Sequence, residues 1–332
     1  MNQEQDSIDE LAVAALGRFG LPANATATLC NVSENHTYRV DDPATGSRFA
    51  LRVHRADYHT ADEIESELAW LDALRAENVV DTPAVIPATD GARVVSTASP
   101  DLGARNFVLF EWLPGAQPDL DSGAAAAAQV ETLGAISARM HGHARRWGRP
   151  AGFSRPRWDY ECTLGPSGHW GAWQAGLGIG AEERRQLGRL DATISARLRE
   201  YGSDEARFGL VHADMRLANL LIDRQHVRVI DFDDCGFSWY MYDFATTVSF
   251  MEDHPRVPEL RDAWVRGYRS VAGLDAADEA ELETFVMLRR LLLVAWIGSH
   301  HTFATEAAEL GAGFTAGTCT LAEDYLTKYS SQ

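Results

Sequence analysis

Residues 210–222 read LVHADMRLANLLI, and residues 227–234 read VRVIDFDD. The first stretch places Asp214 five residues before Asn219, and the second places Asp231 directly after a run of apolar residues. The two short apolar runs, separated by a polar turn, predict two paired β-strands. Such a hairpin brings the three polar side chains to one end, because Asn219 precedes the first strand and Asp231 follows the second.

These three residue types suit the transfer of a phosphoryl group. That reaction needs little covalent chemistry from a protein, but it needs accurate positioning, a proton acceptor for the attacking hydroxyl, and cations that bridge the phosphate oxygens. Asp214 can accept the proton, whereas Asn219 and Asp231 offer the hard oxygen ligands that Mg²⁺ prefers. The pattern therefore predicts catalysis by Asp214 and a Mg²⁺ site at Asn219 and Asp231.

A simpler interpretation treats the same residues as turn formers. Asp214 and Asn219 could cap turns, and residues 231–234 could form a solvated acidic loop after a buried strand. Any one of these residues alone would favour that interpretation, but the joint spacing is much more specific. His212 is expected to orient the loop through hydrogen bonds to the backbone, and not to transfer a proton.

Charge and composition narrow the possible partners. The 332 residues have a net charge of −18 and a pI near 5.0, which disfavours nucleic acid and anionic lipid and favours neutral or cationic small molecules. Lysine occurs once, at Lys328, so no P-loop motif is possible. We expect a monomer or homodimer.

The sequence shows no membrane span and no secretory signal. The N-terminal residues 1–10 are polar and acidic, and no window approaches the roughly 18 apolar residues of a transmembrane helix. The four cysteines are scattered without a C-x-x-C pair, which is typical of neither a zinc site nor a disulfide framework. We therefore expect a cytoplasmic protein.

The first third of the chain alternates β-prone runs with helical patterns, and Leu113-Pro114-Gly115 ends the β character. This predicts a nucleotide-binding lobe at 1–113 and a catalytic and substrate-binding lobe at 114–332. Helices are predicted at 8–19 and 60–76, and strands at 26–32, 36–41, 48–53, 93–97 and 106–112.

The remainder of the chain is mainly helical by its pattern. Residues 147–173 are rich in Gly, Pro and aromatic residues and are expected to be irregular. Helices are predicted at 124–146, 182–201, 256–272 and 276–301.

The H-x-D-x-x-x-x-N spacing followed by D-F-D resembles the superfamily of aminoglycoside phosphotransferases, choline kinases and type II homoserine kinases. The resemblance spans nearly the whole chain. It implies an α+β fold of the protein-kinase type, with a small β-rich N-lobe and a larger, mainly helical C-lobe. It also implies ATP as the donor and a small-molecule hydroxyl as the acceptor.

The resemblance assigns nucleotide-binding roles in the first lobe. Arg52 falls where the family has a phosphate-contacting Lys or Arg, and Glu67 is its expected carboxylate partner, with Glu63 as the rival. The alternative is that Arg52 faces outward from its strand.

Other nucleotide contacts implied by the resemblance depend on the backbone. Ser33 and Asn35 lie in the turn that covers the phosphates in family members, although a plain polar hairpin would look the same. Glu111 and Leu113 occupy the hinge whose backbone pairs with adenine in the family.

The chain also departs from the family. Relatives usually carry His two residues after the catalytic Asp and Gly just before the Asn, where this chain has Arg216 and Ala218. A cation at Arg216 would favour the charged form of Asp214 and could reach the γ-phosphate or an acidic substrate. Asp243 matches a family aspartate that braces the catalytic loop.

Candidate acceptor contacts are Trp158 and Asp159 in the aromatic segment, Asp233 in the D-F-D region, and His300 on a helix. The alternative for each ring is ordinary core packing. For His300, lining a pocket or satisfying a core contact is favoured over binding zinc.

These observations predict an ATP- and Mg²⁺-dependent kinase that phosphorylates a hydroxyl of an amino alcohol, an amino acid or an aminoglycoside-like molecule. A Ser/Thr protein kinase of the bacterial stress-response type shares the motif and stays open. A third alternative is a non-catalytic nucleotide-binding regulator, against which the intact set of Asp214, Asn219 and Asp231 argues.

Overall fold

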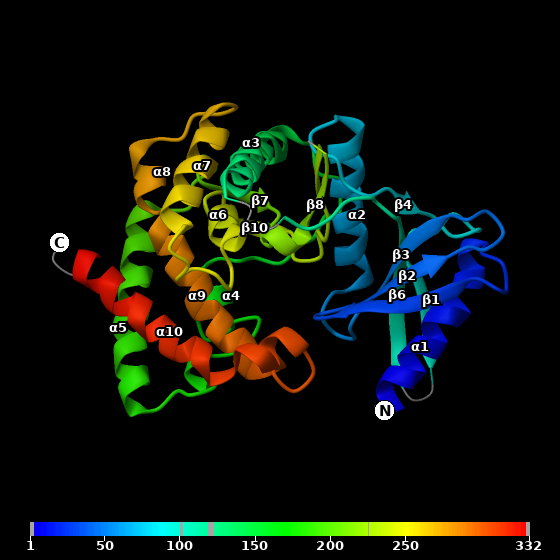
Figure 1. The fold of residues 1–332 in the computed structure, drawn as a ribbon, viewed down its shortest axis with the longest axis horizontal. Helices are drawn as coiled ribbons and strands as arrows, with labels where there is room; N and C mark the ends of the chain where they lie inside the picture. Colours follow the sequence, from blue (N-terminus) through cyan, green and yellow to red (C-terminus); the bar gives the residue numbers. More distant parts are fainter. Residues whose placement is uncertain (1–2, 100–101, 119–122, 225, 330–332) are drawn as a thin grey trace. The chain divides into compact units, whose positions relative to one another are not determined.

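A computed structural model describes residues 3–99, 102–118, 123–224 and 226–329 (Figure 1). The chain divides into two compact units. The N-terminal unit runs to Pro114 and includes Arg149–Arg155, and the C-terminal unit comprises Gly115–Gly148 and the chain from Pro156 onward. The segment 149–155 returns to the N-terminal unit because the Ser154 N–H and the Arg155 guanidinium donate to atoms of a helix there, at 3.0 and 2.9 Å.

The N-terminal unit is built around an antiparallel sheet in the order β1-β2-β3-β6-β4, with β5 also paired to β6 (Figure 1). The helix α1 packs on β1 and β5. The elements are α1 (Gln3–Leu16), β1 (Thr26–Val32), β2 (His36–Asp41), β3 (Arg48–Val53), α2 (Ala61–Ala76), β4 (Val85–Ile86), β5 (Val95–Ser99) and β6 (Gly103–Glu111).

The central strands of the sheet bury their apolar residues, whereas the edge strand β1 is mostly exposed. Leu51 of β3 and Val108 of β6 are fully buried, whereas most of β1 is exposed. One helix begins with a capping box, in which the Thr60 hydroxyl accepts from the Glu63 N–H and the Glu63 carboxylate accepts from the Thr60 N–H. This box satisfies two otherwise unpaired N–H groups, so α2 starts at Ala61.

The C-terminal unit is mainly helical, with two short antiparallel strand pairs, β7–β10 and β8–β9. Its elements are α3 (Ala124–Arg146), α4 (Tyr160–Thr163), α5 (Ala181–Tyr201), β7 (Phe208–Val211), β8 (Leu220–Asp223), β9 (His226–Val229), β10 (Gly236–Trp239), α6 (Tyr242–Thr247), α7 (Val257–Arg269), α8 (Ala276–Ala280), α9 (Leu282–His300) and α10 (Thr305–Tyr329).

The core of this unit surrounds α9, which is buried along nearly its whole length and packs against α5, α6 and α10. The helices α3 and α7 lie side by side (Figure 1). Their close approach depends on Gly134 and Gly267, because a Cβ at either position would meet backbone of the other helix at 2.1 or 1.7 Å. The apolar pattern of α9 thus sets the centre of the unit.

The α+β prediction is confirmed by a sheet-containing first unit and a mainly helical second one. Three strands, at 26–32, 36–41 and 48–53, and the helix at 124–146 have the predicted bounds. The predicted helix at 276–301 is instead divided into α8 and α9 at Glu281. Within the described ranges, no helix is long and apolar enough to cross a membrane.

Candidate active site

The catalytic loop follows β7 and is held by a buried aspartate. The Asp243 carboxylate accepts hydrogen bonds from the N–H groups of His212 at 3.4 Å and Ala213 at 2.8 Å. It also lies 2.9 Å from Nε2 of His141. Ala213 has a φ of 64°, in the left-handed region that a residue with a Cβ seldom occupies. Asp243 therefore supports a strained turn directly before Asp214, in line with its expected bracing role.

His212 connects the catalytic loop to the strand hairpin. Its Nδ1 accepts from the Asp214 N–H at 3.2 Å, and its Nε2 lies 3.2 Å from the carbonyl oxygen of Ile230. Since a carbonyl only accepts, these partners place the proton of the neutral ring on Nε2. The side chain is fully buried. These are the contacts of a residue that orients a loop through its backbone.

The carboxylate of Asp214 is held at both oxygens. Its Oδ1 accepts from the guanidinium of Arg289 at 2.8 Å, and its Oδ2 accepts from the side-chain amide of Asn219 at 2.7 Å. The same Asn219 nitrogen donates to the Asp214 carbonyl at 2.9 Å. Because the nitrogen of that amide faces Asp214, its oxygen is directed the other way, as a metal ligand requires.

The hairpin brings Asn219 and Asp231 together. The N–H of Ile230, one residue before Asp231, donates to the carbonyl of Asn219 at 2.9 Å. Asp231 itself has a φ of 63°, a conformation that aspartate tolerates better than most residues. An amide oxygen and a carboxylate at the end of one hairpin fit a hard divalent cation. The predicted metal ligands thus lie in one place.

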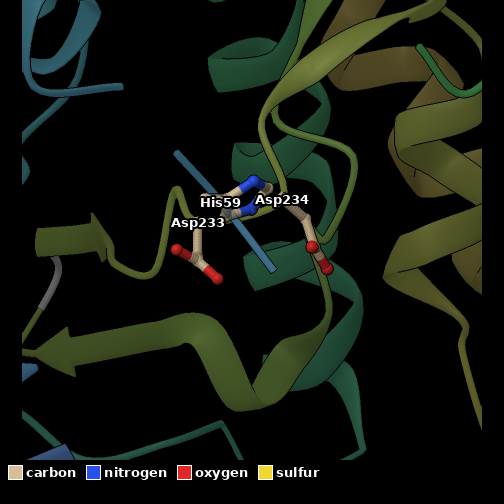
Figure 2. Close-up of side chains that lie close together, drawn as sticks. All are labelled: His59, Asp233 and Asp234. Carbon is tan, nitrogen blue, oxygen red and sulfur yellow. The ribbon is translucent and has the colours of Figure 1, made fainter. Parts of the chain in front are cut away.

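Two more carboxylates follow Asp231 (Figure 2). Asp233 is buried, and oxygens of Asp233 and Asp234 lie within 4.8 Å of each other. The carbonyl of Asp234 accepts from the indole N–H of Trp158 at 2.8 Å. Figure 2 also labels His59, which belongs to the N-terminal unit, where its Nδ1 lies 3.8 Å from a Glu63 oxygen.

Arg216 lies within electrostatic reach of Asp214, but its hydrogen bonds go to another carboxylate. Its guanidinium forks onto the Glu306 carboxylate at 2.9 and 3.3 Å, and it lies over the ring of Phe250 at 5.1 Å. Burial lowers the pKa of Arg216, but Asp214 and Glu306 raise that pKa by more, so the net direction is upward. The cation in direct contact with Asp214 is Arg289.

Trp158 and Asp159, the predicted acceptor contacts, have structural contacts. Trp158 is 2% exposed, and its indole N–H already donates to the carbonyl of Asp234. Asp159 caps α4 by accepting from the Cys162 N–H at 3.0 Å, and it pairs with Arg157 at 2.8 Å. These packing and capping contacts give both side chains a structural role, and their contact with an acceptor stays a prediction.

His300 remains a candidate. It is buried at the end of α9, stacks on Trp296 at a centroid distance of 5.2 Å, and meets the edge of Trp170 at 6.5 Å. Trp170 in turn lies over the guanidinium of Arg289 at 5.2 Å. His300 thus belongs to an aromatic cluster that reaches the partner of Asp214.

In the N-terminal unit, the predicted pair is formed. Arg52 donates to the Glu67 carboxylate at 2.7 Å, and its guanidinium lies 5.1 Å from the centre of the Phe110 ring. Arg52 is buried, which excludes the outward-facing alternative, and Glu63 is occupied in the capping box. Glu67, and not Glu63, is therefore the partner.

The other predicted nucleotide contacts lie in a turn and at the end of a strand. The N–H of Ser33 donates to the carbonyl of Asn35 at 3.1 Å, and the Asn35 side chain accepts from the Arg55 N–H at 3.1 Å. Glu111 ends β6, and its N–H donates to Ala84 at 2.8 Å. Leu113 lies just beyond the strand. The side chain of Asn35 thus fixes the turn, and the nucleotide contacts of Ser33 and Asn35 stay predictions.

The conserved-domain model described as "Phosphotransferase enzyme family" matches residues 29–281. This chain belongs to that family. The match includes the strand that carries Arg52, the loop that carries Asp214, and the β8–β9 hairpin.

Three of the proteins similar to this chain are small-molecule kinases by name. A solved microcompartment-associated aminopropanol kinase is 49% identical and covers 96% of this chain and 98% of its own, with a TM-score of 0.88. Amicoumacin kinase from Bacillus subtilis (strain 168) is 24% identical over 326 residues, which cover 92% of this chain and 90% of that protein. A solved amicoumacin kinase in complex with AMP-PNP and Ca²⁺ is 20% identical, covers 96% and 94%, and has a TM-score of 0.76.

The family and these relatives confirm the prediction of a kinase that acts on a hydroxyl of a small molecule. They also confirm the predicted superfamily and the protein-kinase-like fold. None of these three relatives is named as a protein kinase.

Sequence reasoning missed Arg289 and Glu306. Arg289 and Arg290 stand side by side in the apolar sequence VMLRRLLLVAW, within a buried helix. Since buried arginines need anionic partners, that pattern was the signal for two buried ion pairs. Glu306 had no comparable signal, because its contact with Arg216 spans 90 residues.

Proposed function

We propose that this phosphotransferase transfers the γ-phosphoryl group of Mg²⁺-bound ATP to the hydroxyl of a small amino alcohol of the aminopropanol type. The observation that carries the proposal is the 49% identity to an aminopropanol kinase over 96% of the chain. A neutral or cationic acceptor also suits a chain with a net charge of −18.

The residues take the following roles in this proposal. Arg52, held by Glu67, contacts the phosphates of ATP, and Asn219 and Asp231 hold the metal. Mg²⁺ neutralises charge on the polyphosphate when it is bound. Asp214 accepts the proton of the attacking hydroxyl and aligns its oxygen with the phosphorus.

The test is an ADP-release assay with matched acceptors. We expect 1-amino-2-propanol to give the highest kcat/KM, ethanolamine, choline and homoserine lower values, and propan-2-ol no acceptor-dependent rate. Propan-2-ol is the matched control because it has the same hydroxyl and lacks only the amine. Equal turnover of the two compounds would overturn the proposed recognition of an amino alcohol.

A second acceptor class is favoured by the amicoumacin kinase of Bacillus subtilis, which matches 92% of the chain at 24% identity. Amicoumacin and an aminoglycoside therefore belong in the same assay. If either compound has a higher kcat/KM than 1-amino-2-propanol, the proposed substrate is an antibiotic and not an amino alcohol.

A further inference from the structure

Arg289 is a buried cation whose contacts converge on the catalytic loop. It lies in the middle of α9, is 3% exposed, and donates to Asp214 Oδ1 at 2.8 Å. It also donates to the Ser249 hydroxyl at 3.1 Å and to the Tyr242 hydroxyl at 3.3 Å. The ring of Trp170 covers the guanidinium at 5.2 Å. Arg289 is therefore fixed from several sides.

The neighbouring arginine shows that this pairing is specific. Arg290 is equally buried, but it pairs with Glu252 and donates to Thr318 at 2.9 Å. Each of the two arginines thus has its own carboxylate, and the one assigned to Arg289 is Asp214. Burial lowers the pKa of Arg289, but Tyr242 and Asp214 raise it by more, so this group is a permanent cation.

Two donors on opposite oxygens fix the rotation of the Asp214 carboxylate. Arg289 holds Oδ1, and Asn219 holds Oδ2 at 2.7 Å. A carboxylate has about four lone-pair sites, so these two bonds leave sites that a hydroxyl can use. Because Arg289 extends from a rigid, buried helix, it defines where those sites point.

We propose that Arg289 is a positioning residue for phosphoryl transfer, which holds the Asp214 carboxylate in the orientation that accepts the hydroxyl proton. It acts through Asp214 and does not touch the nucleotide. This inference rests on the proposed function in one respect, the role of Asp214 as proton acceptor. It adds α9, far along the chain from the sequence motif, to the catalytic machinery.

The test compares Arg289→Ala and Arg289→Lys with Arg290→Ala, a matched loss of a buried arginine on the same helix. ADP release with water as the nucleophile is measured first, because it needs no identified acceptor, and then with 1-amino-2-propanol. We expect Arg289→Ala to lose about 10- to 100-fold in kcat, the size of a misplaced catalytic group, with the KM for ATP within about twofold. Millimolar guanidine is expected to restore part of that loss.

Arg289→Lys keeps the charge and loses the fixed fork, so it is expected to fold like the wild type and to retain a reduced kcat. Arg290→Ala is expected to lower Tm without a selective loss of kcat and without rescue by guanidine. A kcat for folded Arg289→Lys equal to that of the wild type would overturn the proposal. Equal losses of kcat in Arg289→Ala and Arg290→Ala, with no rescue of either by guanidine, would also overturn it.

A double-mutant cycle separates positioning from a general loss of structure. In the Asp214→Asn background, Arg289→Ala is expected to cause no further loss of kcat, because the group it positions is already gone. If the double variant instead loses kcat by the product of the two single losses, the proposal is contradicted. If Asp214→Asn itself retains full turnover, the proposed function fails; if Asp214→Asn is impaired and Arg289→Ala is not, only the inference fails.

Discussion

Two residues in or beside the proposed catalytic groups have a strained backbone. Ala213, next to Asp214, and Asp231 both have positive φ angles, of 64° and 63°. Such residues cost of order 1–3 kcal/mol each and persist only where their surroundings enforce them. For Ala213 the enforcing contact is the 2.8 Å hydrogen bond from its N–H to Asp243.

Substitutions of Arg52 test the proposed nucleotide site. Arg52→Ala is expected to weaken ATP binding, and Arg52→Lys to restore part of it, because the charge survives and the fork does not. The measurement is isothermal titration calorimetry with AMP-PNP. Arg48→Ala is the control, since Arg48 lies on the same strand but pairs with Asp41 at the surface. Equal affinities of wild type and Arg52→Ala would reject the assignment.

At the scale of elements, the pairing of α3 and α7 depends on glycine. A methyl group at Gly267 would approach the Glu131 carbonyl oxygen to 1.7 Å. Gly267→Ala is therefore expected to lower the free energy of unfolding by at least the 1–3 kcal/mol typical of overpacking. Gly188→Ala on α5, where a Cβ meets nothing within 4 Å, is the control and is expected to be stabilising by about 1 kcal/mol. Urea denaturation measures the free energy of unfolding of both variants. A value for Gly267→Ala equal to that of the wild type would contradict the prediction.

The start of α2 gives a pH prediction. The pKa of Glu63 is lowered from 4.5 to about 2, chiefly by the His59 imidazole, whose Nδ1 lies 3.8 Å away, and also by the hydrogen bonds from Thr60. Because the pKa is lower in the folded state, the stabilisation is present above pH 4.5 and is lost as the pH falls toward 2.

Thr60→Ala is accordingly expected to lower the free energy of unfolding by about 1 kcal/mol at pH 7. The difference between wild type and Glu63→Gln is expected to shrink as the pH falls through that window. Denaturant titrations at pH 7 and pH 3 measure both quantities. A difference that stays constant with pH would show that Glu63 does not cap α2 as a carboxylate.

At the scale of the whole molecule, the sequence predicted what is local and missed what is distant. The strands at 26–32, 36–41 and 48–53 have strong β-prone runs and clear turns, and their bounds were predicted correctly. The spacing of Asp214, Asn219 and Asp231 predicted the hairpin that joins them. Arg289 and Glu306 could not be assigned to their partners, because those contacts span 75 and 90 residues.

The activity of the whole protein is predicted to require a divalent cation. Asn219 and Asp231 offer hard oxygen ligands at one hairpin end, so turnover is expected to require Mg²⁺ or Mn²⁺. ADP release in excess EDTA, followed by addition of each cation, measures this. Asp231→Asn is expected to raise the Mg²⁺ concentration needed for half-maximal turnover. Full activity in EDTA would contradict the assignment.

The central claim is that Asp214 is the catalytic proton acceptor, and the most direct measurement is the kcat of Asp214→Asn beside its affinity for AMP-PNP. The variant keeps the shape of the side chain but removes the carboxylate. We predict a loss of roughly 10²- to 10⁴-fold in kcat, the range of general-base catalysis, with nucleotide affinity nearly unchanged. Wild-type turnover by a folded Asp214→Asn protein would contradict the account.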